Sequence, residues 1–411
     1  MTQAAPINHN RLFLASCIAL VVTSMTFAIR AGILQKLGVD FGLSDTELGY
    51  ITAMAFLGFP IATIIGGPLY NALGPKTLGY IAFTAHLLGL TLTALSTDFW
   101  GLFISTFLVG FANGMVEAAF NPMIADMFPQ AKTKMLNRFH VWFPGGIVIG
   151  SLVSQAMSEM SWQAQILVML APTLAYGALF FGQAFPAHRH ELSGSSQENL
   201  KAMLSPLYLF ILGCMFLTAT TELGTQQWVE RLLGKAGAEP LLVLALVTGL
   251  MAVGRFFAGP VVHRLNPTGM LWGSAMVSTL GIYLMSIAEG GMVYVAAVVF
   301  AIGVCYFWPT MLGFVAEYIP RAGAFGMSIV GGAGMFATSI FQPIIGGWLD
   351  EARQTALAEG LAPKVAELAA GRAALGNIVI LPAILIVLFG GLFFYMRNRH
   401  HQPETPERVQ G

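Results

Sequence analysis

The chain has 411 residues, of which 56% are hydrophobic and 10% are charged, and its mean hydropathy is +0.72. Soluble domains carry about 25% charged residues, so this composition excludes an ordinary soluble protein and indicates a polytopic protein in a lipid bilayer. The net charge of +0 gives no indication of a nucleic-acid partner. Cys17, Cys214 and Cys305 fall within apolar segments, where we expect buried thiols rather than a disulfide framework.

Apolar segments of about 20 residues, separated by short polar turns, predict an all-α membrane protein with about twelve spanning helices. The first span follows a short polar start and is expected to be retained rather than removed as a signal. The expected spans are residues 12–34, 48–70, 77–95, 102–125, 139–160, 163–185, 207–229, 241–262, 270–287, 292–316, 325–349 and 377–396.

Polar stretches between the spans predict how the chain is oriented. Ser44-Asp45-Thr46-Glu47 has the pattern of a capping box that opens the second helix. Residues 351–374 are rich in alanine with scattered charges, which predicts a helical external loop. Most Lys and Arg residues outside the spans fall on the side of the two termini, so we expect a cytoplasmic (inner) membrane protein with both termini cytoplasmic.

The chain also repeats itself. The motif at residues 67–75 (Gly-Pro-Leu-Tyr-Asn-Ala-Leu-Gly-Pro) resembles residues 259–267, which begin 192 positions later. Residues 126–129 resemble residues 317–320 at an offset of 191. Two separate pairs at nearly one offset predict two pseudo-symmetric six-helix halves. The halves are residues 1–185 and 206–411, joined by a cytoplasmic linker at 186–205.

The fourth span carries Asn113, Glu117 and Asn121 at four-residue steps, which lie on one face of a helix. A carboxylate in hydrocarbon costs several kcal/mol, so this face is expected to meet protein or a water-filled cavity. A structural Glu that joins neighbouring helices is one interpretation. A substrate or ion site is the one we favour.

The seventh span has a second polar face, with Glu222, Gln226 and the adjacent Gln227. Polar amides beside a Glu favour solute binding there, with interhelical hydrogen bonds as the alternative. The repeat offset makes Arg30 the counterpart of Glu222, and it makes Trp308, close to Tyr306, the counterpart of Glu117.

Twelve helices in two parallel halves, with the loop motif after the second helix, resemble the major facilitator superfamily. Within it, residues 117–122 (Glu-Ala-Ala-Phe-Asn-Pro), followed by residues 140–146 (His-Val-Trp-Phe-Pro-Gly-Gly), are similar to the fucose–proton symporter group. The resemblance implies a central cavity lined by helices 1, 4, 7 and 10, a sugar-type substrate, and Glu117 as the proton-linked acid. A second acid of that group would fall near Ala31 and is absent, which leaves uniport open.

These assignments make Asn113, Glu117, Asn121, Glu222, Gln226, Gln227, Tyr306 and Trp308 candidate solute-binding residues. An aromatic cluster opposite an acid suits a sugar ring, although Trp308 is equally consistent with helix packing. Since Arg30 and Glu222 both lie towards the external side, we expect them to pair as an external gate that forms when the cavity opens inwards. The alternative is that each pairs within its own half.

The sequence therefore predicts a secondary transporter that imports a small sugar or polyhydroxy solute with protons by alternating access, and works as a monomer. Burial favours the neutral form of a carboxyl group, which would let Glu117 take up and release the proton. We expect no enzymatic activity, cofactor or metal, because no Walker A loop, His-Glu-x-x-His or Cys-x-x-Cys motif occurs. A uniporter, an exporter of amphipathic compounds and a non-transporting solute sensor are the alternatives.

Overall fold

The computed structural model describes residues 7–128, 135, 138–186, 196–234 and 236–397. Regular structure in these ranges is helical, with no strand, which confirms the predicted all-α class. The elements are α1 (His9–Phe41), α2 (Asp45–Ala94), α3 (Phe99–Met127), α5 (Trp142–Ala156), α6 (Trp162–Leu167), α7 (Leu170–Phe180), α8 (Ser196–Met203), α9 (Pro206–Ala219), the π-helix η1 (Thr220–Gly224), α10 (Thr225–Gln227), α11 (Val229–Leu233), α12 (Pro240–Phe256), α13 (Ala258–Ile287), α14 (Met292–Val304), α15 (Phe307–Tyr318), the 3₁₀-helix η2 (Pro320–Ala322), α16 (Gly323–Ala358), α17 (Pro363–Ile378) and α18 (Ile380–Arg397).

Ten stretches within the described ranges are long and apolar enough to cross a membrane. The α2 ribbon contributes two of them, Asp45–Gly66 and Ala72–Ala94. Helix α5 has 15 residues and α12 has 17, which is short of the ~20 residues that a bilayer requires. The count of twelve spans therefore stays a prediction.

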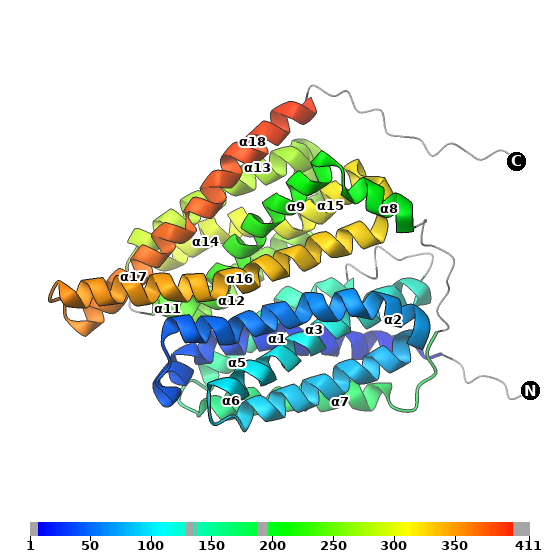
Figure 1. Cartoon of the computed structure of the whole chain (residues 1–411), viewed down its shortest axis with the longest axis horizontal. Coiled ribbons are helices and arrows are strands. Elements are labelled where there is room, and N and C mark those ends of the chain that lie inside the picture. The colour runs from blue at the N-terminus through cyan, green and yellow to red at the C-terminus, as the bar shows by residue number, and fades with distance from the viewer. Residues whose placement is uncertain (1–6, 129–134, 136–137, 187–195, 235, 398–411) are drawn as a thin grey trace, which may run out of the picture.

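The helices form two groups, which Figure 1 shows one above the other. Helices α1 to α7 make the first group, and α9 to α18 make the second. The described chain begins and ends towards the same side, which we call the terminal end. At the opposite end, α1 gives way to α2 and α16 gives way to α17. Residues 187–195 of the predicted linker and the tail after residue 397 lie outside the described residues.

Helices α2 and α13 each bend sharply at one residue with a positive φ angle. Gly74 has φ 75° and ψ 168°, and Asn266 has φ 51° and ψ 168°. Each precedes a proline, which disfavours helical backbone at the residue before it, and glycine and asparagine tolerate positive φ best. Since residues 74 and 266 lie 192 positions apart, the two repeated motifs make the same turn at the predicted spacing.

Glycines let α2 contact both groups closely. A Cβ atom on Gly110 of α3 would lie 2.2 Å from the carbonyl oxygen of Ala55 in α2. A Cβ atom on Gly346 of α16 would lie 2.1 Å from the carbonyl oxygen of Asp45, at the start of α2. Backbone-to-backbone packing of this kind depends on small residues. Helix α2 is therefore held against its own group and against the second group at the opposite end.

Candidate functional site

Arg30 of α1 lies at the boundary between the two groups. It is buried, with 6% of its surface exposed. Its Nε and Nη2 atoms donate to Oε1 of Gln227 in α10, at 3.3 and 3.0 Å. Its guanidinium carbon lies 5.1 Å from the ring centre of Phe27 and 5.6 Å from that of Phe56, within the range of cation–π attraction. Arg30 therefore connects the first group to the second.

Glu222 lies in η1, and π-helical turns occur frequently at functional sites. Its Oε1 accepts a hydrogen bond from Nη2 of Arg255 in α12 at 3.1 Å. Arg255 also donates from Nε to the carbonyl oxygen of Cys305, at 2.8 Å. The second carboxylate oxygen, Oε2, is buried and accepts no hydrogen bond from the described chain.

The predicted pair of Arg30 with Glu222 is not present in this structure. Arg30 contacts a neutral amide across the boundary, and Glu222 contacts Arg255 within the second group. The neighbouring α12 supplies a cation to Glu222 that no comparison of helix depths could reveal. Arg255 thus pairs with an acid of its own group rather than with one across the boundary.

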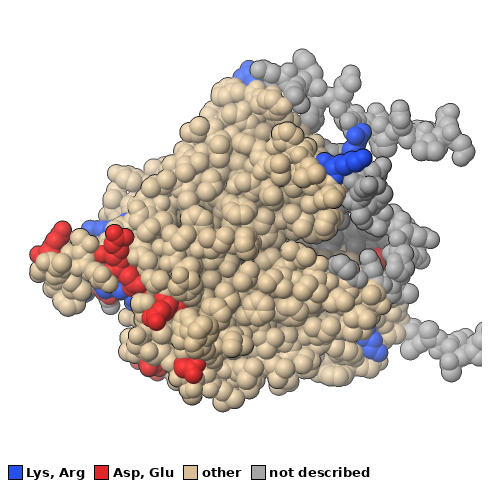
Figure 2. All heavy atoms as spheres, in the orientation of Figure 1, with Lys and Arg blue, Asp and Glu red and all other residues tan. Residues whose placement is uncertain are grey.

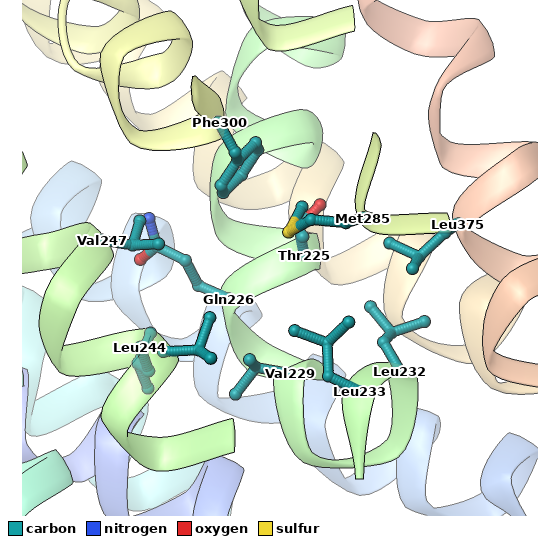
Figure 3. A pocket seen from close by; sticks show the side chains of 11 residues that line it. Thr225, Gln226, Val229, Leu232, Leu233, Leu244, Val247, Met285, Phe300 and Leu375 are labelled. Atoms are coloured by element: carbon teal, nitrogen blue, oxygen red, sulfur yellow. The ribbon is translucent and has the colours of Figure 1, made fainter. Parts of the chain in front are cut away.

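Gln226 lies beside two small pockets. Figure 3 shows the one within the second group, where the Gln226 side chain lies among apolar neighbours such as Leu244, Val247 and Phe300. Its Nε2 atom lies 3.5 Å from the sulfur of Met251. The other pocket is at the boundary, and its lining residues come from both groups: Phe27, Ala28, Phe56, Phe143, Ile147, Leu223, Gln226, Gln227 and Leu244.

The two aromatic candidates of the tenth span have different surroundings. The hydroxyl of Tyr306 donates to the carbonyl oxygen of Gly254 at 3.1 Å, so it is bonded to α12. Trp308 is half-buried and packs against an apolar cluster that includes Phe27 and Phe56 of the first group. Trp308 therefore belongs to the boundary, whereas the hydroxyl of Tyr306 is engaged within the second group.

Glu117 of α3 and Asn121 contact each other and His140. The Glu117 side chain is 12% exposed, and its Oε2 accepts a hydrogen bond from Nδ2 of Asn121 at 2.5 Å. The Oδ1 atom of Asn121 lies 2.9 Å from Nε2 of His140, and that nitrogen lies 3.8 Å from Oε2 of Glu117. His140 therefore joins Glu117 and Asn121 in one polar cluster.

Asn113 is fully buried inside the first group. Its Oδ1 atom lies 2.8 Å from Nε2 of His86, and its Nδ2 atom donates to Oγ1 of Thr26 at 2.9 Å. The other ring nitrogen of His86 lies 2.9 Å from the hydroxyl of Tyr176. These side chains, from four helices of the first group, thus satisfy one another's hydrogen-bonding groups. In this structure the polar atoms of Asn113 are engaged inside the first group, so they do not support a solute-facing surface shared with Glu117.

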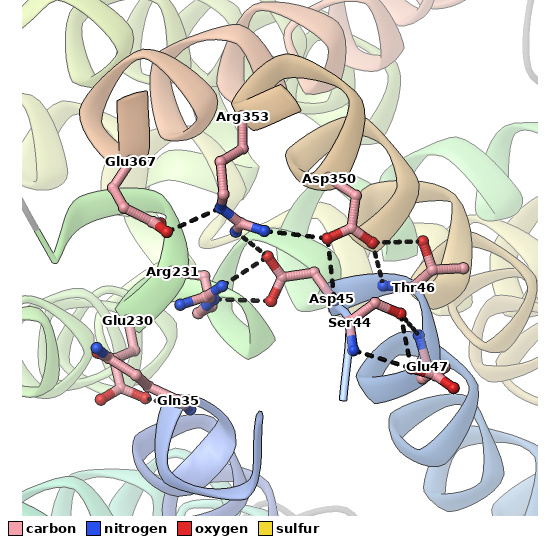
Figure 4. A network of polar contacts seen from close by, with 10 residues as sticks. All are labelled: Gln35, Ser44, Asp45, Thr46, Glu47, Glu230, Arg231, Asp350, Arg353 and Glu367. Atoms are coloured by element: carbon pink, nitrogen blue, oxygen red, sulfur yellow. Dashed lines mark hydrogen bonds and ion pairs between the residues drawn. The ribbon is translucent and has the colours of Figure 1, made fainter. Parts of the chain in front are cut away.

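A charged cluster that the sequence did not reveal joins the two groups at the opposite end (Figure 4). The carboxylate of Asp45 is fully buried and accepts from Nε and Nη2 of Arg231 in α11, at 2.8 and 2.7 Å. It also contacts Nη2 of Arg353 in α16. Arg353 in turn contacts Asp350 at 3.1 Å and Glu367 of α17 at 2.8 Å. We call these five residues the ionic cluster.

The same cluster caps α2 from outside its own group. Oδ1 of Asp350 accepts from the backbone nitrogen of Asp45 at 3.1 Å, and Oδ2 accepts from that of Thr46 at 2.8 Å. Carboxylates are favourable at helix N-termini, where backbone N–H groups have no helical partner. The predicted capping box is confirmed, since the side chain of Ser44 bonds to the Glu47 nitrogen and the Glu47 side chain bonds to the Ser44 nitrogen.

The ends of the molecule also differ in charge. On the face in Figure 2, most visible Asp and Glu residues gather at the opposite end, and most visible Lys and Arg residues lie towards the terminal end. The ionic cluster thus fastens the boundary at the end where the visible acidic residues gather.

Helices in two groups with polar side chains at the boundary between them recur in many membrane transporters. The chain belongs to the Major Facilitator Superfamily, because it matches the sequence pattern of that family over residues 13–341. The protein is therefore a multi-pass membrane protein of this superfamily, as the resemblance in the sequence implied.

Two relatives and one solved structure illustrate the similarity. The chain is 27% identical over 197 residues to the hexuronate transporter of Bacillus subtilis (strain 168), which covers 47% of this chain and 45% of the relative. It is 21% identical over 216 residues to the putative niacin/nicotinamide transporter of the same organism, which covers 51% of this chain and 54% of the relative. The chain thus spans about half the length of these relatives. Its fold is similar to that of a bacterial homologue of the human lysosomal transporter Spinster, in an inward-facing and unoccupied conformation, with a TM-score of 0.79, 13% identity, and coverage of 96% of this chain and 98% of that one.

Proposed function

We propose that this protein is a secondary active transporter that imports a small polar solute, a sugar or related polyhydroxy compound, by alternating access across the cytoplasmic membrane. The observation that carries the proposal is the boundary between the two groups. It is fastened by the ionic cluster at one end and carries Arg30, Gln226 and Gln227 between the ends. A solute held there would face one side at a time as the groups rock about it.

The ionic cluster takes the gate role that we had expected of Arg30 and Glu222. Asp45 belongs to the first group, and Arg231 and Arg353 belong to the second, so the cluster must separate for the opposite end to open. The excess of Lys and Arg on the terminal side supports an orientation in which that side is cytoplasmic. The ionic cluster is then the external gate, and this conformation faces inwards.

A polyhydroxy solute is supported by two observations. The motifs around Glu117 and His140 resemble the fucose–proton symporter group. One relative of the chain is named as a transporter of hexuronate, which is a polyhydroxy compound. Amide groups such as those of Gln226 and Gln227 both donate and accept hydrogen bonds, as sugar hydroxyls require.

Glu117 is the proposed proton carrier. Its described contacts are the Asn121 amide and the His140 ring, with no Arg or Lys among them, and part of its side chain is accessible. A carboxylate without a fixed cation can gain and lose a proton as its surroundings change, which couples proton and solute binding.

Proteoliposomes test this proposal. Purified protein is reconstituted and given a panel of labelled sugars and sugar acids, with an imposed pH gradient or with unlabelled solute inside. The wild-type protein should accumulate one solute against its gradient, and Glu117→Gln should lose accumulation while it retains exchange. Accumulation that is equal in Glu117→Gln would refute the role of Glu117.

Export of amphipathic compounds is the rival function, and one observation favours it: the boundary pocket is lined mainly by apolar residues, among them Phe27, Phe56 and Phe143. Transport of lipophilic cations without transport of any sugar would establish this rival. Exchange without accumulation in the wild-type protein would indicate a uniporter. Saturable binding without any flux would indicate a sensor.

A further inference from the structure

Arg30 is a buried cation without a carboxylate partner. In the described part of the chain, no ion pair reaches it, and its hydrogen bonds go to the neutral amide oxygen of Gln227. Two other arginines are paired: Arg231 contacts Asp45 across the boundary, and Arg255 contacts Glu222 within the second group. A buried charge normally has a counter-ion. Since the described chain supplies none to Arg30, the counter-ion is expected to come from a bound molecule.

The surroundings of Arg30 hold the guanidinium without neutralising it. The rings of Phe27 and Phe56 lie 5.1 and 5.6 Å from its central carbon. They exclude water and favour a cation, but they carry no net charge. Hydrogen bonds within the described ranges leave from Nε and Nη2, so the Nη1 side of the guanidinium has no described acceptor.

A second donor lies next to this side chain. Nε2 of Gln227 is buried and has no hydrogen-bond partner in the described chain, although Gln227 lines the boundary pocket. Its amide cannot be reversed, because a reversed amide would direct N–H groups at the guanidinium of Arg30. Since the amide nitrogen and oxygen share one carbon, the free N–H groups lie close to the guanidinium, at a pocket formed by both helical groups.

We propose that Arg30 and Gln227 bind the carboxylate of a small monoanionic solute, in the terms of the proposed function a sugar acid rather than a neutral sugar. Two planar donor groups side by side match the two oxygens of a carboxylate, and one unpaired positive charge matches one negative charge. The solute anion would supply the counter-ion that Arg30 lacks, while Phe27 and Phe56 would pack on the adjoining carbon atoms. This inference rests on the proposed transport function and specifies its substrate class.

Matched acid and neutral compounds test the inference on the full-length protein. Thermal stability and binding are measured with D-glucuronate against D-glucose, D-galacturonate against D-galactose, and nicotinate against nicotinamide. The acid of at least one sugar pair should bind at least about tenfold more tightly than its neutral counterpart, a difference of 1.4 kcal/mol. Arg30→Gln should abolish this preference. Arg372→Gln is the matched control, because Arg372 is partly exposed, contacts Glu289 and does not line the boundary pocket.

Gln227→Glu keeps the test decisive should Arg30→Gln fail to fold. The new carboxylate would occupy the position of the missing counter-ion, so this variant should be at least as heat-stable as the wild-type protein and should lose acid binding. Equal binding of acid and neutral sugars, or unchanged acid binding in Gln227→Glu, would overturn the inference. The proposed function of sugar transport would not be affected by that result. Binding of nicotinate alone would support the carboxylate site and contradict the sugar assignment. Binding of no compound to the wild-type protein would count against both.

Discussion

Replacing Asp45 with asparagine removes the charge that holds Arg231 and Arg353 together at the opposite end. The asparagine keeps the size of the side chain and one carbonyl oxygen, so the helix start is preserved and the ion pairs are lost. Because Asp45 belongs to the first group and both arginines belong to the second, losing these ion pairs destabilises the conformation that is closed at this end. We therefore expect a shift in conformation rather than unfolding.

The magnitude follows from the burial of the three side chains. Removing one partner of a buried ion pair costs about 3–5 kcal/mol. The Asp45 side chain is fully buried, but those of Arg231 and Arg353 are 15% and 20% exposed, so water can partly solvate them after the change. We take about 2 kcal/mol, which multiplies the ratio of open to closed molecules at this end by about 30, since 1.36 kcal/mol is tenfold.

Distance measurements between spin labels report this shift. Val39 of α1 and Leu361, between α16 and α17, are exposed residues near the opposite end in different groups. Cysteines at these two positions can be labelled selectively, because the native Cys17, Cys214 and Cys305 are buried. Electron–electron double resonance should give mainly the short distance in the parent protein and a majority of longer distances with Asp45→Asn.

Asp98→Asn is the matched control for this experiment. Asp98 caps α3 through the backbone nitrogen of Gly101, at 2.7 Å, and asparagine serves equally well as a cap. The control should leave the distances unchanged. An unchanged distribution with Asp45→Asn as well would refute the reasoning that the ionic cluster holds this end closed.

Two further substitutions test the packing around the site. Gly346→Val should open the opposite end as Asp45→Asn does and should stop uptake, because the valine side chain would clash with the carbonyl oxygen of Asp45. A Cβ atom on the neighbouring Gly347 would lie no closer than 3.8 Å to any neighbour. Gly347→Val is therefore its control, and equal uptake by the two variants would contradict the packing argument. Asn113→Leu should leave a ring nitrogen of His86 without its hydrogen-bond partner and lower the unfolding free energy by about 1–3 kcal/mol. Selectivity, measured as the ratio of the half-saturation concentrations of two transported solutes, should stay constant. A changed ratio in uptake assays would return Asn113 to the solute site.

The sequence predicted the features that depend on one segment at a time. Runs of apolar residues predicted the helices, and the capping box at Ser44 was recognised because its partners lie three residues apart. The repeat was recognised from short motifs, and the backbone turns at Gly74 and Asn266 have the same offset. Local signals of this kind need no knowledge of which helices touch.

The contacts between helices could not be predicted in the same way. Four-residue spacing puts Asn113 and Glu117 on one face, but it does not say that His86 and Thr26 satisfy Asn113. Asp45 and Arg353 lie 308 positions apart, and no pattern in one sequence connects them. Their only signal was the presence of charged residues beside the starts and ends of spans. The partner of a charge depends on the rotation and tilt of neighbouring helices, which packing decides.

Alternating access requires the two ends of the boundary to open in turn around a bound solute. Leu73 and Leu265 are exposed residues of different groups, each next to one of the repeated turns at the terminal end. Spin-label distances for this pair and for Val39 with Leu361 are compared in wild-type protein and in the Asp45→Asn variant. The terminal pair should approach as the opposite pair separates. Distances that stay constant, or that lengthen together at both ends, would contradict alternating access.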